Sequence, residues 1–350
     1  MFLELWEVLE ASYFLISKKN DLIIIYYNNN KMELKTGNTF KNFTLKQYMG
    51  NFGKTTIWNA LLNGTNIIFE IAILNENIIK TSVKTKIYSN FNGEDIVIKK
   101  ELGSGTYGFV YEIENKNNEK YALKIFNEPF EGEDEYTIYK NLSGCPNIVP
   151  IYDGFFINEN DQFFLKMGLM KCEIYKMNLP LNIIFSIVKN ILIALNFMHQ
   201  KNIIHGDLKL SNILLDDKDN AYLCDFSNSF FKDTCVQEVG TIWYRAPEYC
   251  IPNVSNYMID TPSDIWSLGI CFLSMLSEGD VPKFFRLNTP SLLYGRISCQ
   301  PLIDNEIDKI VDKLDIIECE YVKNICKKML TVDPEYRITA DEALNNYFET

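Results

Sequence analysis

The chain has 350 residues, of which 47% are hydrophobic and 13% aromatic, and this composition is typical of folded domains rather than of disordered segments. The formal net charge of −12 argues against a protein that binds nucleic acid by neutralising its phosphates, because such proteins carry a basic face. The length allows two domains, or one two-lobed domain with an extension.

The first 16 residues are predicted to form a short helix. They carry three glutamates and no basic stretch, which argues against a secretory signal. No later segment offers about 18 uninterrupted apolar residues, so we expect no membrane span. The nine cysteines include no CxxC pair, which argues against a zinc site and indicates free thiols. These features predict a chain of the cytoplasm or the nucleus.

Strand-like segments follow, separated by turns that contain Asn and Gly. We therefore expect residues 1–92 to form a small, mostly β extension, and the acidic balance of the chain lies beyond it. Nothing in the extension indicates chemistry. A regulatory or targeting module and a fold packed on the next lobe remain open roles, and any partner is unknown. The predicted strands cover residues 21–27, 31–37, 66–74 and 82–88.

A GNFGKTT stretch in the extension is similar to a phosphate-binding loop at Gly53, Lys54 and Thr55. The Walker pattern needs a further glycine five positions before the second one, and Tyr48 stands there. We therefore interpret the stretch as an ordinary turn.

Three glycines, Gly103, Gly105 and Gly108, form a GxGxxG motif between two strand-like runs. Glycine lets backbone amides approach phosphate oxygens without a side chain in the way. In a dinucleotide-binding fold such a turn opens a helix, whereas here a second strand follows. The motif favours a flap over phosphates, and a plain hairpin is the alternative.

Lys124 lies between apolar residues in the next predicted strand, where a lysine needs a charged partner. It can neutralise the α- and β-phosphates of a nucleotide if a carboxylate holds it in place. Glu135, on a predicted helix over residues 133–142, is the best candidate, and Glu133 is the second choice. The alternative is a lysine whose ammonium group reaches water at the edge of a sheet.

Helical patterns dominate beyond residue 180. Residues 181–200 place their apolar side chains on one stripe, and residues 263–276 are apolar nearly all round, as in the central helix of a helical lobe. A strand-rich half followed by a helix-rich half indicates the α+β class rather than a parallel α/β sheet.

The segment His-Gly-Asp-Leu-Lys-Leu-Ser-Asn at residues 205–212 is followed by Asp225. Asp207 can orient an attacking hydroxyl and accept its proton. Asn212 and Asp225 offer the hard oxygen ligands that Mg²⁺ prefers, and Lys209 could offset charge on a transferring γ-phosphoryl group. Their joint order and spacing predict phosphoryl transfer from a nucleotide.

This pattern resembles the eukaryotic-type protein kinase family, over about three quarters of the chain. Ala246, Pro247 and Glu248 resemble its APE motif, and Arg337 stands where the family places the arginine that pairs with this glutamate. Asp264 begins a sequence similar to the family's DxWxxG helix, continued by Trp266 and Gly269, whose aspartate braces the catalytic loop.

The resemblance implies a bilobal kinase fold with a β-rich small lobe at about 93–170, a helical large lobe at about 171–350, and the extension before it. It implies ATP and Mg²⁺ as cofactors. Met167 matches the gatekeeper and residues 168–170 the hinge that receives adenine. The implied catalytic set is Asp207, Lys209, Lys124 and Glu135, and the implied metal ligands are Asn212 and Asp225. The implied nucleotide contacts are Leu102, Gly103, Ser104, Gly105, Thr106, Gly108, Val110, Ala122, Lys124, Met167, Leu169, Met170 and Leu214.

Lys209 close after Asp207, with Gly240 and Thr241 before the APE motif, is similar to the serine/threonine kinases. The resemblance therefore implies protein substrates with serine or threonine acceptors. A small-molecule kinase also carries an HGD motif, but the glycine flap, Lys209 and the APE motif argue against it.

Three residues depart from the family pattern. Gly206 replaces the arginine of HRD, so we expect activity without phosphorylation of the segment between Asp225 and Glu248. Ser227 replaces the glycine of DFG, which should stiffen that turn. Gly168 replaces a larger hinge residue. These departures leave a catalytically weak or dead scaffold as the alternative function.

Overall fold

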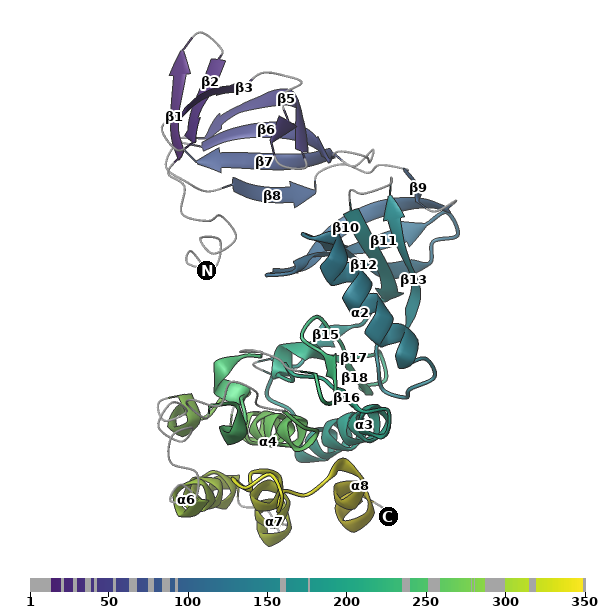
Figure 1. Cartoon of the computed structure of the whole chain (residues 1–350), viewed down its shortest axis with the longest axis vertical. Helices are drawn as coiled ribbons and strands as arrows, with labels where there is room; N and C mark the ends of the chain where they lie inside the picture. Colours follow the sequence, from purple (N-terminus) through teal and green to yellow (C-terminus); the bar gives the residue numbers. More distant parts are fainter. Residues whose placement is uncertain are drawn as a thin grey trace. The chain divides into compact units, whose positions relative to one another are not determined.

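Figure 1 shows the computed structural model of the chain, which divides into two compact units: residues 1–133 with 151–169, and residues 134–150 with 170–350. Side chains are described from Ile96 onward. The structure describes residues 14–19, 22–27, 30–34, 39–40, 43–52, 55–62, 68–74, 79–83, 89–91, 94–157, 162–175, 177–234, 240–250, 259–277, 279, 281–286, 300–314 and 319–348.

The first part of the chain is built of antiparallel strands, as predicted for the extension. Strands β1 (Phe14–Lys19), β2 (Leu22–Tyr27) and β3 (Asn30–Leu34) form one sheet. A second, five-stranded sheet follows in chain order. Its strands are β4 (Thr39–Phe40), β5 (Phe43–Phe52), β6 (Thr55–Leu62), β7 (Ile68–Leu74) and β8 (Ile79–Val83).

Two local predictions for the extension differ from the structure, and part of each falls on residues that the structure does not describe. The predicted helix over residues 1–16 does not reach residue 16, because β1 begins at Phe14; residues 1–13 lie outside the described residues. The strand predicted over 82–88 lies earlier, since β8 ends at Val83, and residues 84–88 are not described. Phe52 pairs with Thr55 across the β5–β6 hairpin, so the GNFGKTT stretch leads into a strand and not into the helix that a phosphate loop opens.

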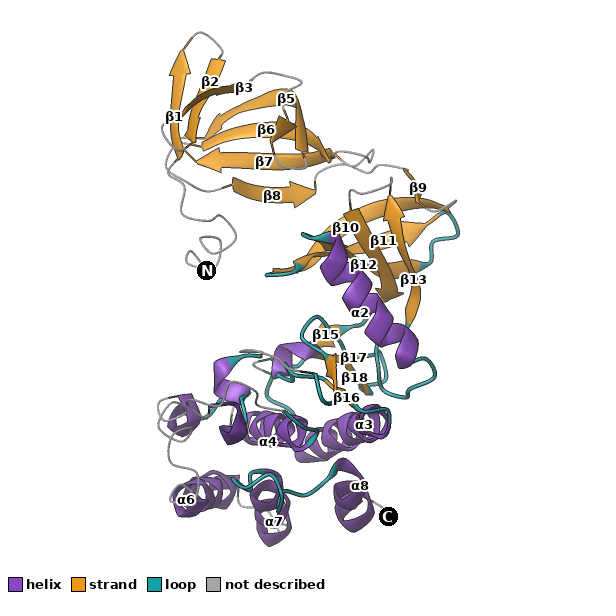
Figure 2. Cartoon of the chain, viewed as in Figure 1, coloured by secondary structure: helices purple, strands orange, loops and turns teal. Residues whose placement is uncertain are grey.

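A six-stranded antiparallel sheet completes the first unit, in the order β13-β14-β12-β11-β10-β9. Figure 2 draws the strands in orange and the helices in purple. Its central strand β12 is buried from Ala122 to Phe126, which explains the nearly continuous apolar run. Strand β9 pairs with β10 although it precedes residue 93. The strands are β9 (Ser89–Phe91), β10 (Glu94–Gly105), β11 (Gly108–Asn115), β12 (Lys120–Phe126), β13 (Ile151–Ile157) and β14 (Gln162–Gly168).

Helix α2 (Pro129–Asn141) follows β12 and begins at a proline, whose missing N–H costs nothing at a helix start. Its first turn packs on the sheet through Gly132, where a Cβ would lie 2.5 Å from the Phe163 ring. The helix predicted over residues 133–142 is therefore confirmed, with an earlier start.

The second unit is mainly helical. Helix α3 (Leu181–Gln200) buries the predicted apolar stripe, and α4 (Pro262–Leu276) is buried along nearly its whole length. Further helical segments are α6 (Gln300–Val311), α7 (Cys319–Met329), α8 (Ala340–Ala343), the π-helical turn η5 (Leu344–Phe348) and the short 3₁₀ turns η1 (Leu210–Asn212), η2 (Ile242–Tyr244), η3 (Pro247–Cys250) and η4 (Asp312–Leu314).

Two small sheets lie among these helices. Strands β15 (Cys172–Glu173), β17 (Ile213–Leu215) and β18 (Ala221–Leu223) form one, and β16 (Ile203–Ile204) pairs with β19 (Phe230–Phe231) in the other. Together with the β-rich first unit, they confirm the α+β class with a β-rich small lobe and a helical large lobe.

Among the described residues, one helix, α3, is long and apolar enough to cross a membrane by length and composition. Lys189 and several polar residues interrupt its apolar run, which is why the sequence alone predicts no span there. Eight of its side chains, including Ile187 and Leu192, are buried inside the second unit, as in a core helix. The helix is therefore weak evidence for a span.

Candidate active site

The loop 205–212 and the end of strand β18 bring three of the predicted site residues together. Asn212 comes directly before β17, and Ile213 pairs with Leu223 of β18. The N–H of Cys224 donates to the Asn212 carbonyl at 3.0 Å, which places Asp225 beside Asn212. Asn212 Nδ2 donates to the Asp207 carbonyl at 2.9 Å. A short hairpin thus aligns Asn212 with Asp225, which are 13 positions apart in the sequence.

Asp207 is buried, and its carboxylate is held from both sides. Its Oδ1 accepts hydrogen bonds from the Thr241 N–H at 2.7 Å and the Thr241 hydroxyl at 2.8 Å. Its Oδ2 accepts from Lys209 Nζ at 2.8 Å, and the same ammonium group donates to Thr241 Oγ1 at 3.2 Å. Three donors therefore fix the carboxylate in one orientation.

The backbone of the loop 205–212 is held by Asp264, the second residue after Pro262 in α4. Its carboxylate accepts from the N–H groups of His205 at 2.9 Å and Gly206 at 3.1 Å, and it contacts His199 Nε2 at 3.0 Å. Burial alone would raise the pKa of Asp264, but the hydrogen bond from His199 and the neighbouring imidazole and N–H groups outweigh it and hold that pKa below its ordinary value. The predicted brace is confirmed.

The turn 225–227 leaves strand β18 through Asp225, which has a left-handed backbone with φ of 63°. Phe226 is buried, and its ring lies edge-on to Tyr139 of α2 at 4.7 Å and beside His205 at 5.1 Å. Glu135 of α2 reaches the same turn, where it accepts from the Phe226 N–H at 3.4 Å. Helix α2 and the loop 205–212 therefore both contact this turn.

The glycine motif lies in the first unit, at the tip of the β10–β11 hairpin. Gly105 pairs with Gly108, so the chain reverses over Thr106 and Tyr107. A Cβ on Gly103 or Gly105 would meet nothing within 4 Å, whereas one on Gly108 would lie 2.0 Å from the Ile125 carbonyl oxygen. Gly108 is thus needed for packing, and the other two leave an open backbone face that suits phosphate oxygens.

Lys124 lies on β12 between Val110 of β11 and Leu165 of β14. Only 7% of the residue is exposed, and Nζ lies 4.8 Å from the centre of the Phe126 ring. This burial argues against a lysine that reaches water. Lys124 belongs to the first unit and Glu135 to the second, and their pairing stays a prediction.

The implied adenine contacts occupy neighbouring strand positions. Ala122 of β12 pairs with Met167 of β14, and both are buried. Leu102 of β10 is 42% exposed. Ser104 and Thr106 are exposed, Leu169 and Met170 follow β14, and Leu214 lies in β17 of the second unit. Their common role in nucleotide binding stays a prediction.

The donor set at Asn212 and Asp225 fits Mg²⁺. Both residues offer oxygen ligands, which this hard cation prefers. Since Asn212 Nδ2 donates to the Asp207 carbonyl, the amide oxygen of Asn212 is the atom that could bind a cation. The open backbone face at Gly103 and Gly105 leaves room for a phosphate chain, because an added Cβ there would meet nothing within 4 Å.

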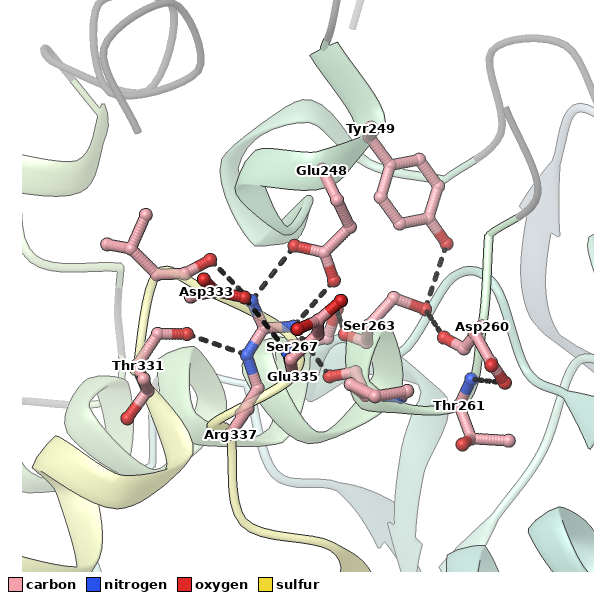
Figure 3. Close-up of polar contacts among 12 residues, drawn as sticks. Glu248, Tyr249, Asp260, Thr261, Ser263, Ser267, Thr331, Asp333, Glu335 and Arg337 are labelled. Atoms are coloured by element: carbon pink, nitrogen blue, oxygen red, sulfur yellow. Dashed lines mark hydrogen bonds and ion pairs between the residues drawn. The ribbon is translucent and has the colours of Figure 1, made fainter. Parts of the chain in front are cut away.

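Glu248 and Arg337 form a bidentate ion pair in the interior of the second unit (Figure 3). Arg337 Nη1 lies 2.6 Å from Glu248 Oε1, and Nη2 lies 2.9 Å from Oε2. The guanidinium group also donates to the carbonyls of Thr331, Pro262 and Val332, so this buried cation is well satisfied. The pairing implied by the APE motif is confirmed.

Two contacts were not predicted from the sequence. His199 supports Asp264, and the Ser227 hydroxyl contacts two carboxylates. One signal in the sequence was available for the His199–Asp264 contact. His199 stands at the end of an apolar helix stripe, six residues before His205. The second joins residues 92 positions apart, which no local pattern reveals.

The chain is similar to known proteins that are protein kinases. The family model described as a protein kinase domain matches residues 96–348. The chain is also similar to Extracellular signal-regulated kinase 7 of Drosophila melanogaster, with 26% identity over 293 residues. That alignment covers 71% of this chain and 32% of the relative, so the chain spans about a third of the relative's length.

Proposed function

Because the chain belongs to the protein kinase family, we propose that it is an active serine/threonine kinase that transfers the γ-phosphoryl group of ATP to hydroxyl groups of proteins. The observation that carries this proposal is the Asp207 carboxylate held between Lys209 and Thr241. A scaffold without activity has no need of a buried carboxylate oriented by three donors.

Asp207 is proposed to accept a hydrogen bond from the substrate hydroxyl and so to orient it toward the phosphorus atom. The Lys209 side chain contacts this carboxylate and can also offset charge on the γ-phosphoryl group as it transfers. Lys124 is proposed to bind the α- and β-phosphates, with Glu135 as its partner. The glycine hairpin covers the phosphates with backbone N–H groups.

Asn212 and Asp225 are proposed to hold Mg²⁺, which neutralises charge on the phosphates when it is bound. The residues implied to bind adenine, such as Ala122 and Met167, supply apolar surface. Lys209 and Thr241 beside Asp207 support serine or threonine as the acceptor, since this is the pattern of that branch of the family. Nucleic acid is not proposed as a partner, because the chain carries a formal net charge of −12.

The described cysteines Cys145, Cys172, Cys224, Cys271 and Cys326 are free thiols. They support the proposal that the protein works in a reducing compartment, such as the cytoplasm or the nucleus.

The test compares the whole chain with its Asp207→Ala variant, using radiolabelled ATP, Mg²⁺ and protein substrates such as casein and histone. We expect label on serine or threonine of the substrate with the unaltered chain only. Equal silence of both proteins on several substrates would favour the scaffold. Label on amino alcohols or sugars, but not on proteins, would favour a small-molecule kinase.

A further inference from the structure

The hydroxyl group of Ser227 lies between two carboxylates. Ser227 Oγ is 2.5 Å from Glu135 Oε2 and 2.9 Å from Asp225 Oδ1. Glu135 comes from helix α2, and Asp225 lies at the end of strand β18. One side chain therefore joins a helix to a residue that the proposed function assigns to the metal.

The position tolerates a side chain without strain. In the turn 225–227 the left-handed backbone belongs to Asp225, with φ of 63°, and not to Ser227. A β-carbon at residue 227 thus meets no backbone penalty. The prediction that serine stiffens this turn by restricting its backbone is therefore only part of the account, because the hydroxyl group adds two specific contacts.

The turn is fixed on either side of the hydroxyl. The Phe226 ring is buried against Tyr139 and His205, and the Phe226 N–H donates to the second oxygen of Glu135. Ser229 Oγ donates to the His205 carbonyl at 2.9 Å. These contacts hold the Ser227 backbone in place, so the hydroxyl position is defined by more than the serine itself.

A hydroxyl group carries one proton and can donate it to one of two carboxylates at a time. Without the hydroxyl group, the two carboxylates would lose the donor that they share, and like charges at close range repel. The hydroxyl group thus both orients Asp225 and separates it from Glu135.

We propose that Ser227 is a positioning residue, which orients the Asp225 carboxylate for Mg²⁺ and ties it to helix α2 through Glu135. This inference rests on the proposed function, because it takes Asp225 as a metal ligand. Mg²⁺ demands nearly ideal octahedral geometry, so a ligand that is free to rotate binds it less well. Groups that hold a metal ligand in place typically change metal affinity about 10- to 100-fold when they are lost.

The experiment measures Mg²⁺ binding by calorimetry on the whole chain in the presence of adenylyl-imidodiphosphate, a non-hydrolysable ATP analogue. We expect Ser227→Ala and Ser227→Gly each to weaken Mg²⁺ binding about tenfold, and Ser227→Thr, which keeps the hydroxyl group, to stay within about twofold of the unaltered chain. Affinity for the analogue without metal should not change. Ser274→Ala is the matched control, because it removes a buried hydroxyl that donates to the Ile270 carbonyl inside α4.

The tie to α2 is tested by combining Ser227→Ala with Glu135→Gln. If the hydroxyl group couples the two carboxylates, Glu135→Gln should change Mg²⁺ affinity in the unaltered chain but much less in the Ser227→Ala background. Equal effects in both backgrounds would remove the coupling from the proposal.

Normal Mg²⁺ affinity in Ser227→Ala overturns the inference and leaves the proposed function intact. Normal Mg²⁺ affinity in Ser227→Gly together with weakened Mg²⁺ affinity in Ser227→Ala also overturns the inference. The backbone and not the hydroxyl group would then be responsible. If the unaltered chain itself binds no Mg²⁺ with the analogue, the proposed function fails and the inference falls with it. Thermal melting without nucleotide identifies a variant that does not fold, and the remaining hydroxyl-free variant then decides.

Discussion

Gly240 packs against the backbone of Gly206 so closely that a Cβ on Gly240 would lie 2.3 Å from the Gly206 carbonyl oxygen. Both glycines have left-handed backbones, with φ of 79° and 77°. A Cβ on Gly206 would in turn lie 2.5 Å from the Asn228 carbonyl oxygen. Two segments therefore meet the loop 205–212 backbone to backbone, at the position where the family pattern has an arginine.

We predict that Gly206→Ala destabilises the protein more than Gly144→Ala does. Gly144 has nearly the same φ, 80°, but a Cβ there would meet nothing within 4 Å. Both variants carry the cost of a left-handed alanine, and Gly206→Ala carries a further ~1–3 kcal/mol from the clash. Urea unfolding of both variants and the unaltered chain measures the difference. Equal losses of unfolding free energy in the two variants would mean that the loop 205–212 moves aside freely.

The same packing supports the prediction that activity does not require phosphorylation between Asp225 and Glu248. Gly206 offers no cation to a phosphate, and the described end of the segment is already held through Gly240 and Thr241. We expect protein shown by mass spectrometry to be unmodified to be active, with a gain of less than about tenfold on phosphorylation of that segment. A larger gain would contradict this prediction, and Thr234→Ala would then test one exposed acceptor within it.

The sequence allowed the residues with fixed local spacing to be predicted, and the reason is visible in the structure. Asn212 and Asp225 flank a single hairpin, so their separation along the chain determines their proximity. The Ser227 contact with Glu135 depends on how α2 packs against the turn 225–227, which apolar periodicity does not encode. The first residues show where a local pattern misleads. A helix is predicted up to residue 16, but strand β1 begins at Phe14, although apolar and polar side chains alternate poorly around it.

We predict that Thr241→Val lowers kcat about 10- to 100-fold while the KM for ATP changes little. Valine keeps the shape and the N–H donor to Asp207 but removes the hydroxyl group that contacts Asp207 and Lys209. Steady-state kinetics with a protein substrate measures both constants. Thr241→Ser retains the hydroxyl group and serves as the control, with kcat within about threefold of the unaltered chain. A change confined to the KM for ATP would assign Thr241 to nucleotide binding instead.

A last prediction concerns acid pH and the buried Asp264. Its folded-state pKa is held below the ordinary value by His199 and the N–H groups of His205 and Gly206, despite burial. A lowered folded pKa means that the ionised carboxylate stabilises the fold fully above the ordinary value near 3.8 and loses this effect as the pH falls through the lower folded value.

Asp264→Asn should therefore cost most at neutral pH, about 2–3 kcal/mol for hydrogen bonds that lose their charged acceptor. The difference from the unaltered chain should shrink as the pH falls below about 4, because the unfolded chain then takes up a proton on Asp264 while the folded chain, with its lowered pKa, does so only at lower pH. Urea unfolding at a series of pH values from about 7 to 3 measures it. A difference that stays constant or widens toward acid pH would show that Asp264 acts through packing rather than through its charge.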